Sequence, residues 1–192
     1  VRYDKKDFME VSGGQWLAGD IFAYQVLIED LKERTGRSSD MFLLHMDKDV
    51  NERVWSSGGN FIKGRSGDRI AGSLNIISTL QYDQERVLVS VYPWKRRDGG
   101  VRPVVYTMQL ATGNFRKVTV GPGRGAQIRS NRTGTMLLAR VPKPGLAVEH
   151  FYYDRSKDEP EWQKISLNFP GISDLRYITN DGKYVYGVTQ VE

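Results

Sequence analysis

The feature that most constrains the fold of this chain is a repeated series of short strand-like segments separated by turns. One series comprises residues 87–92, 104–110 and 115–120, which are rich in β-branched and aromatic side chains. Asp98-Gly99-Gly100 and Thr112-Gly113 lie between them. Such residues bounded by Gly and Asp are typical of strands. The short connections predict an antiparallel meander.

The same plan recurs twice further along the chain. The predicted strands there are residues 126–130, 136–141, 148–153, 162–167, 174–179 and 184–189. The last two are joined by Asn180-Asp181-Gly182, a hairpin signal because glycine accepts a positive φ without steric cost. The pattern predicts an all-β chain throughout its second half.

The spacing of equivalent positions identifies the repeating unit. Met46 and Leu110 are 64 residues apart, as are Val54 and Val118, whereas Leu110 and Tyr153 are 43 residues apart. A repeat of about 40–50 residues with four strands is the spacing of β-propeller blades. The longer interval predicts an insertion around residues 60–72.

We therefore predict an all-β fold of antiparallel four-stranded β-propeller blades, in an incomplete ring of about four blades. The whole chain, residues 1–192, is expected to form this one partial propeller domain. The predicted blade-like units are residues 8–59, 70–121, 126–168 and an incomplete unit at 172–192. Closed propellers have about 4–8 blades, and an open ring leaves strand edges unpaired. We expect either a piece of a larger protein or self-association through open blade edges.

One segment, residues 24–36, is open to two interpretations. Its composition and the terminal Gly36 suit a helix that ends at a glycine. The alternation of apolar residues from Phe22 to Ile28 instead favours a strand followed by a long polar hairpin loop. We prefer the strand, because residues 87–92 are also followed by a long polar loop.

Composition excludes several functional classes. The chain has no Cys, which rules out a disulfide scaffold, a thiolate metal site and a cysteine nucleophile. No apolar run approaches the roughly 18–20 residues of a membrane-spanning helix. The chain begins at Val1 without Met, which suggests a processed or excised piece. We expect a bacterial protein that is periplasmic or secreted, with a cytoplasmic location as the alternative.

The net charge of +5 is concentrated in one stretch. Between Arg86 and Arg132 there are ten Lys and Arg residues and one acid, Asp98. These basic residues fall mostly in loops and at alternate strand positions, which is typical of a solvated face rather than of a nucleic-acid site. The predicted contact with another domain or with carboxylate-bearing peptides comprises the loop residues Trp94, Lys95, Arg96, Arg97 and Arg102.

Several motifs resemble the N-terminal β-propeller of the prolyl oligopeptidase family of serine peptidases, as found in dipeptidyl aminopeptidases and acylaminoacyl peptidases. They include residues 76–80 and 86–91, a tyrosine strand leading to Leu110-Ala-Thr-Gly113, and the hairpin at 180–186. The likeness spans roughly residues 70–190, and TolB-like and other propellers share its turn motifs. It implies a partner, the C-terminal α/β-hydrolase domain of the same parent protein, and peptides as ligands.

No catalytic, cofactor-binding or metal-binding residue is identified in the chain. The family's serine lies in a Gly-x-Ser-x-Gly turn between a strand and a helix, a motif that is absent here; Gly64-Arg-Ser-Gly67 has the wrong spacing. We interpret His45 and His150, which lie in apolar strands, as structural and partly buried. Residues 121–125 are interpreted as a turn between blades, because a phosphate-binding loop needs a helix after it.

Two functional hypotheses follow. The first is a non-catalytic propeller domain that gates peptide access to a hydrolase domain absent from this chain, so that the parent protein is a serine peptidase. The alternative is a stand-alone, TolB-like propeller that serves as a binding module. The hypotheses differ in whether a hydrolase domain follows Glu192 in the parent protein.

Overall fold

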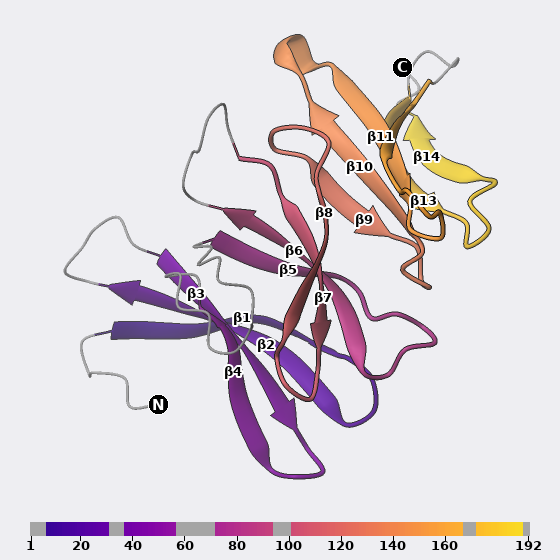
Figure 1. The fold of residues 1–192 in the computed structure, drawn as a ribbon. Coiled ribbons are helices and arrows are strands. Elements are labelled where there is room, and N and C mark those ends of the chain that lie inside the picture. The colour runs from indigo at the N-terminus through magenta and orange to yellow at the C-terminus, as the bar shows by residue number, and fades with distance from the viewer. Residues whose placement is uncertain (1–6, 31–36, 57–71, 94–100, 167–171, 190–192) are drawn as a thin grey trace.

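The computed structural model describes residues 7–30, 37–56, 72–93, 101–166 and 172–189. Within these ranges the chain forms fourteen strands and a single 3-10 turn at Pro144–Leu146. Figure 1 shows the strands gathered into successive sheets that follow one another in chain order.

Every sheet is antiparallel, and its strands are ordered as they occur in the sequence. The first sheet contains β1 (Asp7–Trp16), β2 (Ile21–Asp30), β3 (Arg37–His45) and β4 (Val50–Ser56). The second contains β5 (Gly72–Ser78), β6 (Arg86–Pro93), β7 (Val104–Gln109) and β8 (Phe115–Val120). The third contains β9 (Gln127–Ser130), β10 (Met136–Pro142), β11 (Val148–Asp154) and β12 (Trp162–Ile165). The fourth contains β13 (Ile172–Ile178) and β14 (Val185–Thr189).

This arrangement is that of propeller blades, each a small meander packed face to face on the next. The prediction of an all-β fold built from antiparallel blades is therefore confirmed. The ambiguous segment is also settled over its described part, because residues 21–30 form β2 and pair with both β1 and β3. The predicted insertion at residues 60–72 lies almost wholly outside the described residues.

The first two sheets enclose the largest apolar core. Strands β2, β3 and β4 contribute Ala23, Met41, Leu43, Val54 and Trp55, all at most 4% exposed. The second sheet supplies the opposing side chains Leu74, Val87, Val89, Val91, Tyr106, Met108, Leu110 and Phe115. The alternation of side chains along each strand sends these residues to one face.

The opposite face of the second sheet packs on the third sheet. Leu88 and Val105 lie there against Ile128, Leu137 and Tyr153. Strand β6 is thus buried on both faces, which explains why Val87, Leu88, Val89 and Val91 are apolar on both sides of the strand; Ser90 is the one polar residue of this buried run. The aromatic residues Tyr153 and Trp162 pack together with ring centroids 5.2 Å apart and belong to this core between the second and third sheets.

Side-chain hydrogen bonds join neighbouring sheets at their margins. Gln25 Nε2 donates to the Leu74 carbonyl at 2.8 Å, and Trp55 Nε1 donates to the Gly72 carbonyl at 3.3 Å. Between the second and third sheets, Trp162 Nε1 donates to the Val120 carbonyl at 2.8 Å. Each bond ties a side chain of one sheet to the backbone of the next.

A glycine turn in the third sheet depends on a close approach from the second sheet. Gly134 has φ +74° and lies where a Cβ would come within 2.0 Å of Leu80 Cδ2. Arg155 Nη1 also donates to its carbonyl at 2.6 Å. The position therefore requires glycine for both backbone conformation and space.

We expect Gly134→Ala to lower the free energy of unfolding by about 2–4 kcal/mol, because left-handed strain and overpacking add. Gly145→Ala is the matched control, since Gly145 has the same φ of +74° and no atom within 4 Å of an added Cβ. Its loss should be about 1–2 kcal/mol from backbone strain alone. Urea unfolding measures both variants, and equal losses would show that crowding at Gly134 is unimportant.

Tyr92 provides a pH-dependent link between the second sheet and the segment leading to the third. Its hydroxyl donates to the Ala126 carbonyl at 2.9 Å. Burial raises the pKa of this hydroxyl above its ordinary value of 10.0. Because the folded state holds the proton more tightly than the unfolded state, this contribution to stability is present below pH 10.0 and declines as pH rises through the higher folded-state pKa.

We therefore expect the wild type to lose more stability than Tyr92→Phe when pH is raised above 10.0. Urea unfolding at a series of alkaline pH values measures the difference. Tyr82→Phe is the control, since Tyr82 is 80% exposed. Parallel pH dependence in the wild type and Tyr92→Phe would contradict the prediction.

Candidate binding pocket on the inner strands

From the second sheet onward, the first strand of each sheet contacts the first strand of the next sheet. Contacts join β5 to β9 and β9 to β13. We call β1, β5, β9 and β13 the inner strands, because in a propeller the blades are arranged around a central channel. Each inner strand ends its sheet and pairs on one side only.

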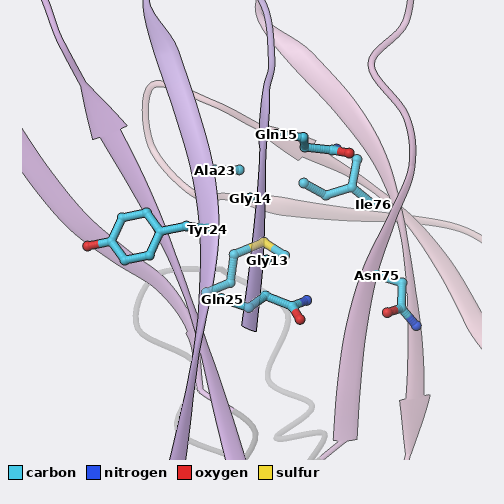
Figure 2. Close-up of a pocket in the computed structure, with 9 residues that line it drawn as sticks. Gly13, Gly14, Gln15, Ala23, Tyr24, Gln25, Asn75 and Ile76 are labelled. Atoms are coloured by element: carbon cyan, nitrogen blue, oxygen red, sulfur yellow. The ribbon is translucent and has the colours of Figure 1, made fainter. Parts of the chain in front are cut away.

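A pocket of about 210 Å³ lies between the first sheet and β5. Figure 2 shows the side chains of Gln15, Gln25, Asn75 and Ile76 gathered around it, whereas the Tyr24 ring points away from them. The lining residues are Gly13, Gly14, Gln15, Ala23, Tyr24, Gln25, Met41, Asn75 and Ile76.

The local structure of β1 creates this space. The pairing of β1 with β2 shifts register between Val11 and Gly13, which is a β-bulge. Gly13 then pairs with Gln25, and an added Cβ at Gly13 would meet no atom within 4 Å. Gly14 is more constrained, because an added Cβ would lie 2.5 Å from the Phe22 ring. The two glycines therefore open the pocket on one side and admit the Phe22 ring on the other.

The chemistry of the pocket is polar but uncharged. None of its nine lining residues is ionisable except Tyr24, whose ring points away from the group, and three of them carry carboxamides. Gln25 is held in place by its bond to the Leu74 carbonyl. Carboxamides both donate and accept hydrogen bonds, whereas Ala23, Met41 and Ile76 provide apolar contacts. The arrangement suits a neutral, hydrogen-bonding ligand with a small apolar group.

Of the five residues predicted from the sequence to make a contact, the structure describes one. Trp94, Lys95, Arg96 and Arg97 fall outside the described residues. Arg102 is exposed just before β7.

A backbone bond from Gly125 N to the Val101 carbonyl at 3.0 Å places the Arg102 segment beside the β8–β9 connection. Arg124 is exposed in that connection. The structure thus places the segment before β7 beside the β8–β9 connection, and neither Arg102 nor Arg124 lines the pocket.

Sequence reasoning missed the pocket, although one signal was present. Gly13-Gly14 interrupts a strand-like segment, and glycine inside a strand often marks a bulge or a close backbone approach. The predicted reading of residues 121–125 as a connection between blades is confirmed, since β9 follows and no helix does.

The two histidines are buried in different sheets. His45 is 7% exposed at the end of β3, and His150 is 3% exposed in β11. Over the described ranges, no three His, Asp or Glu side chains gather as metal ligands would. Over the same ranges, no helix is long and apolar enough to cross a membrane.

The antiparallel meander sheets, packed on one another in chain order, define the class of protein as a propeller-type domain. Comparison with solved structures agrees: TolB from Acinetobacter baumannii matches 96% of this chain with a TM-score of 0.50 and 19% sequence identity. This chain spans 38% of that TolB chain, and at such identity the likeness concerns the fold alone. No family model and no curated protein matches the sequence.

The pocket wall depends on Gln25, so we expect Gln25→Met to lower the free energy of unfolding by about 1–2 kcal/mol. The substitution leaves the Leu74 carbonyl without its side-chain donor. Gln15→Met is the control, because it makes the same change at an exposed position on β1, on the same face of the first sheet. Urea unfolding compares the two, and an equal effect would show that the cross-sheet bond contributes nothing.

Proposed function

We propose that this chain is a propeller-type interaction module that binds an extended, uncharged peptide segment at the pocket between β1 and β5. The single observation that carries the proposal is the pocket lining, which combines three carboxamides, an apolar wall and two glycines. In this proposal residues 1–192 act as one domain, and the blades provide a rigid support for the pocket.

The dimensions of the pocket favour one inserted side chain rather than a whole small molecule. Its volume of about 210 Å³ is below the roughly 300–1,000 Å³ of pockets that enclose drug-sized ligands. A peptide laid along a strand edge can insert one side chain while its backbone bonds to the protein. Both β1 and β5 end their sheets, which supports this mode of binding.

Gly13→Leu tests the proposal, because it adds a side chain on the strand face that carries Gln15 and meets no existing atom at its Cβ. The probe is a positional-scanning library of short acetylated and amidated peptides, measured by fluorescence anisotropy. The wild type should select uncharged peptides, and Gly13→Leu should weaken the selected peptide about 10-fold or more.

Gln84→Leu is the control, since it adds the same side chain at an exposed position in the β5–β6 loop. Its affinity should equal that of the wild type. Absence of any selected peptide, or equal weakening by both variants, would overturn the proposal. Circular dichroism confirms that each variant retains its β-structure.

The second candidate is the gating of peptide access to an α/β-hydrolase domain. It is supported by the motif resemblance to the prolyl oligopeptidase family and by the exposed Arg102 next to the Arg124 connection. In this proposal the loop from Trp94 to Arg102 contacts the hydrolase domain or carboxylate groups of peptides. The bacterial, periplasmic or secreted location inferred from the sequence belongs to both candidates, and the bacterial origin of the TolB chain accords with it.

The two candidates predict different responses to charge. Under the gating proposal, Arg102→Glu should weaken binding of an acidic peptide and reduce its dependence on salt, because one cation of the basic loops is reversed. Anisotropy with a matched neutral peptide is the control. If a neutral peptide binds more tightly than the acidic one and Arg102→Glu has no effect, the gating proposal is rejected and binding at the pocket remains.

A further inference from the structure

Two polar pockets adjoin at the end of the second sheet where its β5–β6 and β7–β8 connections lie. The smaller has a volume of about 280 Å³ and the larger a volume of about 520 Å³. Both are lined by Glu85 and Arg86, and we call the two pockets together the arginine groove. The smaller pocket is completed by Thr107, Gln109, Asn114, Phe115 and Arg116, and the larger by Tyr82, Asp83, Gln84 and Thr133. None of these residues lines the pocket on the inner strands.

The β5–β6 loop, which contributes to both parts of the groove, is held on two sides by backbone hydrogen bonds. Gln81 N donates to the Arg132 carbonyl in the β9–β10 turn at 2.8 Å, and the Glu85 carbonyl accepts from Leu110 N at 2.7 Å. Leu80, at the start of the loop, has φ +53°. A leucine in the left-handed region is strained, and such strain persists only where surrounding contacts fix the backbone. The loop therefore presents its side chains from a fixed position.

Asp83 orients Arg86 within this loop. Asp83 Oδ1 accepts hydrogen bonds from the backbone N–H groups of Glu85 and Arg86, both at 3.1 Å, and Asp83 Oδ2 accepts from Arg86 Nε at 2.6 Å. The two terminal nitrogens of the Arg86 guanidinium have no hydrogen-bond partner within the described ranges. A guanidinium group that is already oriented and keeps free donors suits the recognition of an oxyanion.

Two further arginines belong to the same region. Arg116 lines the smaller pocket together with Arg86, and it is exposed. Arg155 lies beside the turn that carries Thr133, because its Nη1 donates to the Gly134 carbonyl at 2.6 Å. Neither Arg116 nor Arg155 forms an ion pair with any carboxylate that the structure describes. Their positive charges are therefore available to a bound anion.

The groove carries an excess of positive charge. Arg155 is half-buried and interacts electrostatically with Arg86. The pKa of the Arg155 guanidinium is lowered, mainly by burial, and the charge of Arg86 acts in the same direction. Asp83 and Glu85 supply two negative charges against the three guanidinium groups. A bound anion would reduce the repulsion between these cations, which favours its binding.

We propose that the arginine groove binds a small organic molecule through a phosphate group. A phosphate monoester carries a charge of about −1.5 to −2 at pH 7 and three acceptor oxygens. In the smaller pocket, Arg86 and Arg116 hold the phosphate by charge-assisted hydrogen bonds, and Arg155 adds positive charge beside Arg86. The organic part lies in the larger pocket, whose volume of about 520 Å³ falls within the roughly 300–1,000 Å³ of small-molecule sites.

Titration with inorganic phosphate at constant ionic strength tests the site, with binding followed by NMR of the arginine Nε–Hε groups. The resonances of Arg86 and Arg116 should shift, and acetate should bind more weakly because it carries a single charge. Arg116→Gln should weaken phosphate binding about 10-fold or more, the loss expected for hydrogen bonds to a charged group. Arg124→Gln is the matched control, because Arg124 is exposed and lines neither part of the groove.

The proposal is overturned if phosphate binds no more tightly than acetate, or if Arg116→Gln and Arg124→Gln weaken it equally. Equal weakening would mean that phosphate responds only to the net charge of the protein. Retention of the β-structure in each variant is checked by circular dichroism.

Variants of opposite charge give a test of sign. Glu85→Gln removes a negative charge that lines both pockets, so it should tighten phosphate binding about 3-fold. Arg155→Gln should weaken phosphate binding by a similar factor, and Arg155→Lys, which keeps the charge, should restore most of the affinity. Weaker binding by Glu85→Gln would contradict the electrostatic basis of the site.

Phenyl phosphate tests the placement of the organic part. Tyr82, which is 80% exposed and lines the larger pocket, offers its ring for stacking. Phenyl phosphate should therefore bind about 3-fold more tightly than inorganic phosphate, and Tyr82→Ala should remove this difference without changing the affinity for inorganic phosphate. Equal affinities of the wild type for the two probes would contradict this placement. All these variants leave the pocket on the inner strands intact, so the results are independent of peptide binding.

Discussion

Face-to-face packing of apolar side chains is the interaction on which the rest of this structure depends. A four-stranded antiparallel meander has two faces, and a small sheet gains stability mainly by covering them. The second sheet shows the complete case, with Val87 and Val89 against the first sheet and Leu88 against the third. At roughly 25 cal/mol per Å² of apolar surface buried, this packing is the main stabilising term. The polar contacts at the sheet margins orient the sheets on one another.

The same packing is seen at the ends of the row. Among the described residues, the core of the first sheet packs on the second sheet, and that of the fourth sheet packs on the third. Trp16 is 59% exposed in the first sheet and Tyr186 is 58% exposed in the fourth, whereas Val89 and Tyr106 of the second sheet are 0% and 4% exposed.

The pocket arises where this packing is locally relaxed. The bulge and the Gly13-Gly14 pair remove side chains from β1, so the first sheet does not close fully on β5. Carboxamides occupy the remaining space, and one of them, Gln25, also bonds to the backbone of the second sheet. Gln25 therefore both lines the candidate pocket and joins the two sheets.

Local sequence patterns by themselves determined the strands, the antiparallel meanders and the blade-like repeat, because side-chain alternation and turn residues such as Gly113 and Gly182 act within a few residues. They also favoured a strand rather than a helix from Phe22 to Ile28, which lies within β2. Only the tertiary structure decided where the pocket lies and which apolar residues pack between sheets. Those properties depend on contacts between strands about 50–60 residues apart, such as Gln25 with Leu74, and local patterns carry no record of such contacts.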